Sequence, residues 1–130
     1  MRALFEGEPR IPVDVNVLLT ATRRSFYEIQ LRIINIGHDG LSEIEVSCSP
    51  FDLLKIKPFK IGNLEPGKST TVIIASEVSD HTISLNYRRS IVIRISALDS
   101  QGLKLRPIEH KVTIGELKAD WDRRRKESQQ

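Results

Sequence analysis

The stretch Tyr27-Glu-Ile-Gln-Leu-Arg-Ile-Ile-Asn-Ile-Gly37-His-Asp-Gly40 decides the fold class of this chain. Its first half alternates apolar and polar residues with a period of two, which is typical of a half-buried β-strand. Asparagine, aspartate and glycine follow, and they favour turns because they tolerate a positive φ or bond to their own main chain. The stretch therefore predicts a strand over residues 27–33 and a turn over residues 35–40.

A second turn signal lies at Leu64-Glu-Pro-Gly-Lys-Ser-Thr-Thr71, immediately before a run rich in β-branched residues. Pro66 presets its own φ, and Gly67 can supply the positive φ of a type II turn. Neither turn arranges His, Cys, Ser or paired carboxylates as a reacting site requires. We therefore interpret both turns as parts of the fold rather than as a ligand site.

Similar alternation elsewhere predicts the remaining strands. The expected strands cover residues 12–19, 27–33, 43–48, 68–78, 88–98 and 103–114, with a hairpin loop at 99–102. Residues 51–56 form a short apolar run between two prolines, which favours an edge strand or a crossing segment. Residues 20–25 and 79–87 are expected to be polar connections, the second irregular and anchored to the core by Ile83 and Leu85.

The last expected strand changes phase near Pro107. Leu103 and Leu105 are apolar at odd positions, whereas Ile108 and Val112 occupy even ones. A β-bulge at Pro107 explains both phases, and it favours an edge position because proline cannot donate to a ladder. Beyond the strand, residues 116–130 lose the alternation and place acids ahead of bases, which predicts a short helix that depends on Leu117 and Trp121 docking on the sheets.

Seven or eight short strands with turn signals and no long helix between them predict an all-β fold. We expect an immunoglobulin-like antiparallel β-sandwich of seven to eight strands with a short, charged C-terminal helix. The expected organisation is a lead-in at residues 1–11, a sandwich at 12–115 and a charged, helical tail at 116–130.

Composition narrows the classes of function. The 130 residues carry a net charge of +3 and a pI near 9.2, but basic residues are dispersed among acidic ones and aromatics are only 5%. Nucleic-acid modules concentrate positive charge and interleave aromatics, so nucleic acid is not the expected partner. No apolar stretch approaches the ~20 residues that cross a bilayer, so no membrane span is expected in this chain.

No catalytic, cofactor or metal site is predicted. His38, His81 and His110 lack the local spacing of transition-metal ligands. Cys48 is the only cysteine and falls on an apolar strand phase, so it is interpreted as a packing residue rather than a reactive thiol. Oxygens for Ca²⁺ could come from loop aspartates, although no calcium-loop pattern is present. These candidates are Asp39, Asp80 and Asp99.

Three groups of surface residues give weaker hypotheses. Arg94 is expected to pair with Glu43 or Glu45 across the sheet, as a surface ion pair rather than as a ligand contact. Apolar residues on outward phases could form a contact surface or lie beneath the tail helix. Clustered cations in the tail could contact anionic surfaces, although the tail's net charge is small. The outward apolar residues are Ile34, Ile73 and Val92, and the tail cations are Arg123, Arg124, Arg125 and Lys126.

The turn and strand motifs also resemble a known family. They are Leu31-Arg-Ile-Ile-Asn35-Ile-Gly37, then Leu41-Ser-Glu-Ile-Glu-Val46, then Ile61-Gly-Asn-Leu64-Glu-Pro66-Gly67-Lys-Ser-Thr-Thr-Val72. Together they resemble the CARDB-type and related sandwich domains of archaeal and bacterial proteins, over about residues 12–114. A weaker similarity is to domains related to the major sperm protein and to ciliary or centrosomal sandwich modules, which bind peptides. The CARDB resemblance implies a non-catalytic accessory role in adhesion, carbohydrate association or spacing.

Together these patterns predict a module that is not an enzyme. It would contact another protein, or its own copy, through a sheet face or an edge strand such as the one near Pro107. A carbohydrate-associated or cell-surface spacer domain is the alternative, and an adaptor for anionic surfaces or nucleic acid is a weaker one. The compartment stays open: cytoplasmic if the chain is complete, cell surface if it belongs to a longer secreted or anchored protein.

Overall fold

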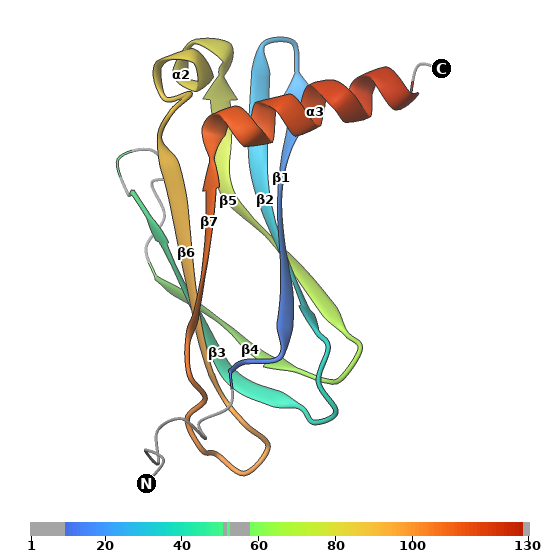
Figure 1. Ribbon diagram of the computed structural model, residues 1–130, viewed down its shortest axis with the longest axis vertical. Coiled ribbons are helices and arrows are strands. Elements are labelled where there is room, and N and C mark those ends of the chain that lie inside the picture. The colour runs from blue at the N-terminus through green and yellow to red at the C-terminus, as the bar shows by residue number, and fades with distance from the viewer. Residues whose placement is uncertain (1–9, 51, 53–57, 129–130) are drawn as a thin grey trace, which may run out of the picture.

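The computed structural model describes residues 10–50, 52 and 58–128 of the chain, and its strands form two antiparallel sheets (Figure 1). One sheet has three strands in the order β1-β2-β5, and the other has four in the order β4-β3-β6-β7. The predicted all-β sandwich with a C-terminal helix is therefore confirmed, with seven strands in the described residues. The strands are β1 (Val13–Arg23), β2 (Phe26–Asn35), β3 (Leu41–Ser49), β4 (Phe59–Leu64), β5 (Ser69–Ser79), β6 (Ser90–Leu98) and β7 (Ile108–Thr113), and the helices are α2 (Asp80–Leu85) and α3 (Ile114–Ser128).

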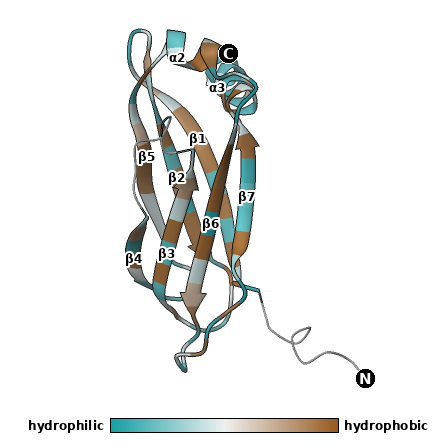
Figure 2. Cartoon of the chain, turned by 90° about the vertical axis from the view of Figure 1, so that its left-hand side faces the viewer, coloured by the Kyte–Doolittle hydropathy of each residue, from teal (hydrophilic) through white to brown (hydrophobic). Residues whose placement is uncertain are grey.

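The core lies between the two sheets, where the alternation of the sequence points the apolar side chains. On β2 the odd positions from Tyr27 to Ile33 are buried, and on β6 the odd positions from Ile91 to Ala97 are buried. Figure 2 shows the contrast between β6, which is mostly hydrophobic, and the edge strand β7, which is mostly hydrophilic. The strand phases predicted for β2 and β6 are therefore confirmed.

Both polar connections were predicted too broadly. β1 continues to Arg23, so the expected connection over residues 20–25 shrinks to a tight turn at Arg24 and Ser25, with Ser25 at φ 67°. The expected irregular segment over 79–87 contains the helix α2, which begins where the Ser79 hydroxyl accepts a hydrogen bond from the Thr82 N–H at 3.1 Å. Ile83 anchors α2 in the core as predicted.

Leu85, the other anchor predicted for this segment, is 71% exposed, so that prediction is wrong. The expected segment at 51–56 lies outside the described residues, apart from residue 52.

The phase change near Pro107 is confirmed. Ile95 lies opposite Ile108, and Leu98 lies opposite Lys104. The chain between Lys104 and Ile108 therefore has one residue more than the facing segment of β6 between Ile95 and Leu98. Leu105 is buried on one side of the change, and Ile108 packs against the core on the other. β7 is an edge strand of its sheet, as the proline predicted.

Candidate interaction surfaces

The two turns that define the fold meet at one buried side chain, Asn35. Its side chain is 0% exposed, and its amide N–H groups donate to the carbonyl oxygens of Leu64 and Asp39, each at 2.9 Å. Its Oδ1 accepts from the Gly37 N–H at 2.8 Å. Asn35 was predicted to bond its own turn, and the bond to Leu64 in the second turn is a connection that the sequence pattern did not indicate.

Backbone hydrogen bonds complete this clamp. The Asn35 N–H donates to the Lys68 carbonyl at 3.0 Å, and the Gly67 N–H donates back to the Asn35 carbonyl at 2.8 Å. The Lys68 N–H donates to the Glu65 carbonyl at 3.0 Å, and Gly67 has φ 77°, as the predicted type II turn requires. We call Asn35 with these two turns the Asn35 clamp, and it fixes the loops around it because the side-chain amide, the N–H and the carbonyl of Asn35 all have hydrogen-bond partners.

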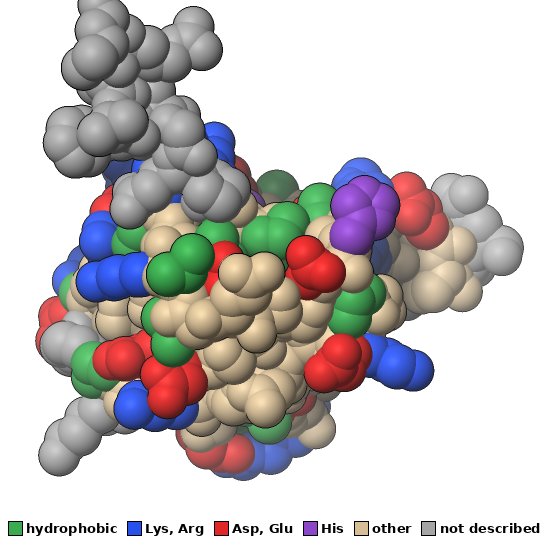
Figure 3. All heavy atoms as spheres, turned by 90° about the horizontal axis from the view of Figure 1, so that it is seen from below, with side chains coloured by type: hydrophobic (Ala, Val, Ile, Leu, Met, Phe, Trp, Pro, Cys, Tyr) green, Lys and Arg blue, Asp and Glu red, His purple; other side chains and the backbone are tan. Residues whose placement is uncertain are grey.

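The clamp lies at the end of the sandwich that carries the β2–β3, β4–β5 and β6–β7 loops, opposite the two helices (Figure 1). We call this end the loop end, and Figure 3 views it from below, with hydrophobic and acidic side chains among backbone and uncharged polar side chains. An open cavity of about 320 Å³ lies there, lined by residues 37–41, by Asp99 and Leu105, and by Arg10 and Pro12. The lining combines a proline and two leucines with charged groups.

Two large apolar side chains at the loop end are exposed to solvent. Ile36 is 64% exposed in the β2–β3 loop, and Leu103 is 63% exposed in the β6–β7 loop. Ile36 is held in place because its N–H donates to the Pro12 carbonyl at 2.9 Å. Leu103 is held because its N–H donates to the Asp99 carboxylate at 2.9 Å and its carbonyl accepts from the Asp99 N–H at 2.8 Å. Both side chains thus stand on ordered backbone.

The sequence analysis did not select Ile36 and Leu103. Ile36 was considered a turn residue, and Leu103 was assigned to the apolar phase of the last strand. The available signal was a large aliphatic side chain next to a turn glycine, Gly37 in one case and Gly102 in the other. Such a residue has little strand surface to cover it.

The histidines and loop aspartates are spread over the molecule. His38 and Asp39 line the cavity with Asp99, whereas His81 and Asp80 lie in α2 at the other end, and His110 lies on β7. No group of three or more His, Cys, Asp or Glu side chains that could hold a metal ion occurs among residues 10–50, 52 and 58–128. Asp99 uses Oδ1 to bind the N–H groups of Gln101 and Leu103, so it shapes its own hairpin loop.

Cys48 lies in the core on β3, where it is 2% exposed. Burial raises the pKa of its thiol to about 11, so almost no thiolate forms at neutral pH. These properties agree with the interpretation of Cys48 as a packing residue.

The pairing predicted for Arg94 is wrong. Its guanidinium lies 3.2 Å from the carboxylate of Glu109 on β7, and its neighbour on β3 is Ser47 rather than Glu43 or Glu45. β7 pairs with the other side of β6 and places Glu109 directly opposite Arg94, whereas Glu45 on β3 lies opposite Ser96. Both side chains of the pair are more than half exposed, so its contribution to stability is small.

The outward apolar residues do not form one surface. Ile34 and Ile73 belong to the β1-β2-β5 sheet, and Val92 belongs to the other sheet. Ile73 is 50% exposed, while Ile34 and Val92 are partly buried. Ile73 is therefore the strongest apolar contact candidate of the three.

The helix α3 packs across the helical end of the sandwich (Figure 1). Leu117 is 2% exposed, and the Trp121 ring meets the Tyr27 ring edge to face with centroids 6.3 Å apart. The predicted docking of Leu117 and Trp121 is confirmed, although the helix begins at Ile114 rather than at residue 116. Burial, and next a hydrogen bond with Asp80, raises the pKa of Tyr27.

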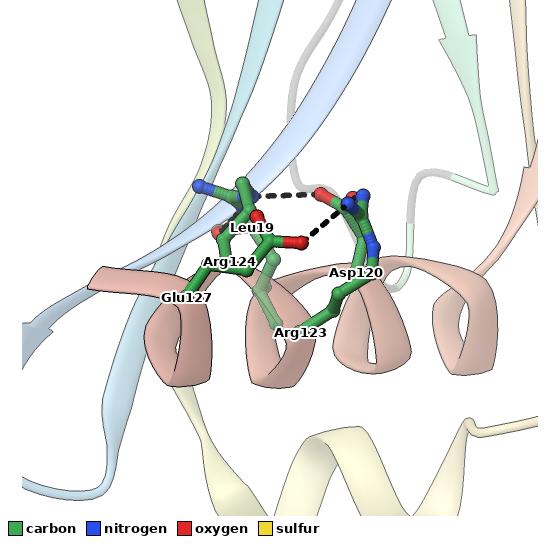
Figure 4. A network of polar contacts seen from close by, with 5 residues as sticks. All are labelled: Leu19, Asp120, Arg123, Arg124 and Glu127. Carbon is green, nitrogen blue, oxygen red and sulfur yellow. Dashed lines mark hydrogen bonds and ion pairs between the residues drawn. The ribbon is translucent and has the colours of Figure 1, made fainter. Parts of the chain in front are cut away.

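A polar network holds α3 to β1 (Figure 4). Arg124 donates to the Leu19 carbonyl at 2.6 Å and to the Asp120 carboxylate at 2.8 Å. Arg123 also pairs with Asp120 and with Glu127. Burial acts to raise the pKa of Asp120, but the hydrogen bonds from Arg124 and Arg123 outweigh it, so the pKa is lowered.

The four sheet edges differ in how open they are. β4 has six residues and β7 has six, and both carry lysine, which discourages pairing with another strand. On the β1 edge, Arg124 of α3 donates a hydrogen bond to the carbonyl oxygen of Leu19, so this group is already paired. β5 has eleven residues, with Glu77 as its only charged one, and β2 is its one sheet neighbour among the described strands.

Comparisons with known proteins add no assignment. The chain matches no model of a known protein family, and no curated protein matches its sequence. No helix within the described residues is long and apolar enough to cross a membrane. The proposals below therefore rest on the residues and on the geometry of the sandwich.

Proposed function

We propose that this chain is a non-catalytic interaction module that contacts another protein through its loop end. The observation that carries the proposal is the pair of exposed aliphatic side chains, Ile36 and Leu103, each more than 60% exposed on a loop whose neighbouring residues line the open cavity. Large apolar groups on ordered loops at one end of a sandwich favour recognition of a protein surface.

The energetics support this use of the loop end. Burying one aliphatic side chain of this size contributes about 1.5–3 kcal/mol. The Asn35 clamp holds the β2–β3 loop, and Asp99 holds the β6–β7 loop, so a partner would order little backbone on binding. Binding to preorganised loops loses less free energy to conformational ordering, so the affinity is higher.

The CARDB resemblance supports the same proposal, since it implies an accessory rather than a catalytic role. It also suggests carbohydrate association, which would use exposed aromatic side chains as a platform. Tyr27 and Trp121 pack against each other instead, and Tyr87, 51% exposed, lies at the helical end beside α3. The geometry of the aromatic residues that the structure describes therefore favours a protein partner over a carbohydrate.

The adaptor for anionic surfaces receives less support from the tail. Four of its cations, Lys118, Arg123, Arg124 and Arg125, lie in ion pairs on α3 itself, such as Lys118 with Asp122 at 2.7 Å and Arg124 with Asp120 at 2.8 Å. A cation that is already paired gains less from a phosphate, because the existing pair must first be broken.

Affinity capture from an extract of the source organism tests the proposal. The bait is the whole chain, compared with a loop-end variant that combines Ile36→Glu and Leu103→Glu. The matched control combines Leu85→Glu and Tyr87→Glu, because those side chains are also exposed, at 71% and 51%, but lie at the helical end. Circular dichroism and thermal unfolding confirm that all three proteins fold.

We expect the wild type and the control to capture the same protein, and the loop-end variant to capture about tenfold less or none. This loss corresponds to at least one buried aliphatic contact. Equal capture by all three proteins, or no specific capture by the wild type, contradicts the proposal.

A further inference from the structure

Hydrogen bonds show which residues of β5 face its open side. The Asn35 N–H donates toward β5, to Lys68 at 3.0 Å, whereas the N–H of the next residue, Ile36, donates in the opposite direction, to Pro12 at 2.9 Å. Odd residues of β2 therefore bond to β5, and even residues bond to β1, as antiparallel strands alternate.

The register then assigns the residues of β5. Ile33 lies opposite Thr70 and Leu31 lies opposite Val72, so Thr70 and Val72 carry the hydrogen bonds to β2. The residues between and beside them direct their backbone N–H and C=O groups away from β2. These edge-facing residues are Ser69, Thr71 and Ile73.

This part of β5 is regular, uncharged and rich in β-branched residues. The register with β2 is continuous from Ser69 to Ile73 and shifts only after it. Residues 69–76 contain no charged side chain, and Ile73 is 50% exposed. Figure 1 shows this lower part of β5 away from both helices. An edge of this kind is a template for strand addition.

We propose that the occupant of this edge is β5 of a second copy of the chain, paired antiparallel about a twofold axis at Thr71. A twofold axis makes a strand meet its own copy in antiparallel order. Thr71 then faces Thr71 of the partner subunit, and Ser69 faces Ile73 of the partner subunit. The two three-stranded sheets become one continuous sheet across the dimer.

Symmetry is the reason for choosing a second copy. Near a twofold axis a charged residue lies close to its own copy and is repelled, so a neutral segment suits self-pairing better than a charged one does. The edge-facing residues provide three pairs, each exchanging two backbone hydrogen bonds as in any antiparallel ladder. The register shift after Ile73 limits the pairing to this segment. The inference goes beyond the proposed function and does not depend on it.

Light scattering after size-exclusion chromatography, over a series of concentrations, tests the dimer. We expect the mass of the whole chain to rise from 14.8 kDa toward twice that value with concentration. Thr71→Lys places two like charges at the axis, and Thr71→Pro removes an N–H that β2 does not use, so both should stay folded but keep the monomer mass. The matched control is Thr22→Lys, the same exchange at an exposed position on β1 of the same sheet.

The control must dimerise like the wild type. A wild type that stays monomeric at its highest soluble concentration overturns the inference, and so does a dimer that both Thr71 variants leave intact. The loop-end capture experiment uses different residues, so the failure of one proposal leaves the other standing. Circular dichroism verifies that the Thr71 variants are folded.

Discussion

Replacing Asn35 by alanine tests how the two turns are joined. The change leaves the Leu64 carbonyl buried without its partner, which costs about 1–3 kcal/mol. It also removes the bonds to Asp39 and Gly37, which are partly buried and would each cost about 0.5 kcal/mol because water can reach them in part. We therefore expect Asn35→Ala to lower the free energy of unfolding by about 3 kcal/mol, a large share of a typical 5–15 kcal/mol.

Urea unfolding followed by the fluorescence of Trp121, the only tryptophan, measures this change. Asn16→Ala is the matched control, because Asn16 is exposed on β1. A loss of stability for Asn35→Ala no larger than that of the control would refute the reasoning.

A second variant, Asn35→Asp, separates hydrogen bonding from packing. Its carboxylate would face two carbonyl oxygens at the positions where Asn35 now donates at 2.9 Å, so its pKa in the folded state is raised above the unfolded value. A raised folded pKa means that stability falls as pH rises through it. We expect this variant to gain stability relative to the wild type as the pH falls through its raised folded pKa, until the pH reaches the unfolded value of about 3.9. A parallel pH dependence of the two proteins would count against the clamp.

Three further predictions concern α3 and the core. Leu117→Ala should lower the free energy of unfolding by about 2–4 kcal/mol, measured by urea unfolding, and should detach α3. Near-ultraviolet circular dichroism should then show the loss of the contact between Trp121 and Tyr27. The lowered pKa of Asp120 predicts a stabilisation that is present above its ordinary value of 3.8 and lost as pH falls through the lowered pKa. Acid titration of unfolding should therefore show a loss of about 1 kcal/mol in the wild type that Asp120→Asn lacks. Native Cys48 should resist iodoacetamide at neutral pH and react once the chain unfolds, and fast native alkylation read by mass spectrometry would contradict its burial.

Local patterns predicted most of the sandwich. Alternation placed the inward residues of β2 and β6, and the phase change at Pro107 predicted both the extra residue and the edge position of β7. These features depend on the side-chain period of a strand and on a missing N–H, and both can be read from neighbouring residues.

Features that depend on tertiary context were not predicted. Six residues are too few to show helical periodicity, so α2 was missed, although Ser79 and Asp80 provide a cap and an acidic first turn. Arg94 pairs with Glu109 because the register of β6 with β7 places the two residues directly opposite each other, and this cross-strand register is not a local property of the sequence. The bond from Asn35 to Leu64 spans 29 residues, and no local rule could indicate it.

Of the candidate surface residues, too, some could be predicted from the local sequence and others depend on tertiary context. The sequence singled out Ile73 because its outward phase is a local property, and the structure leaves it exposed on an open edge. Ile36 and Leu103 became candidates only when folding placed their loops at one end of the sandwich beside the cavity.

Amide hydrogen exchange of the chain, alone and bound to its captured partner, tests the central claim most directly. The claim is that the loop end is the binding surface. We expect binding to slow exchange at residues 36–40 and 99–103 and to leave α2 unchanged. Slowed exchange confined to α2 and α3, with the two loops unchanged, would contradict it.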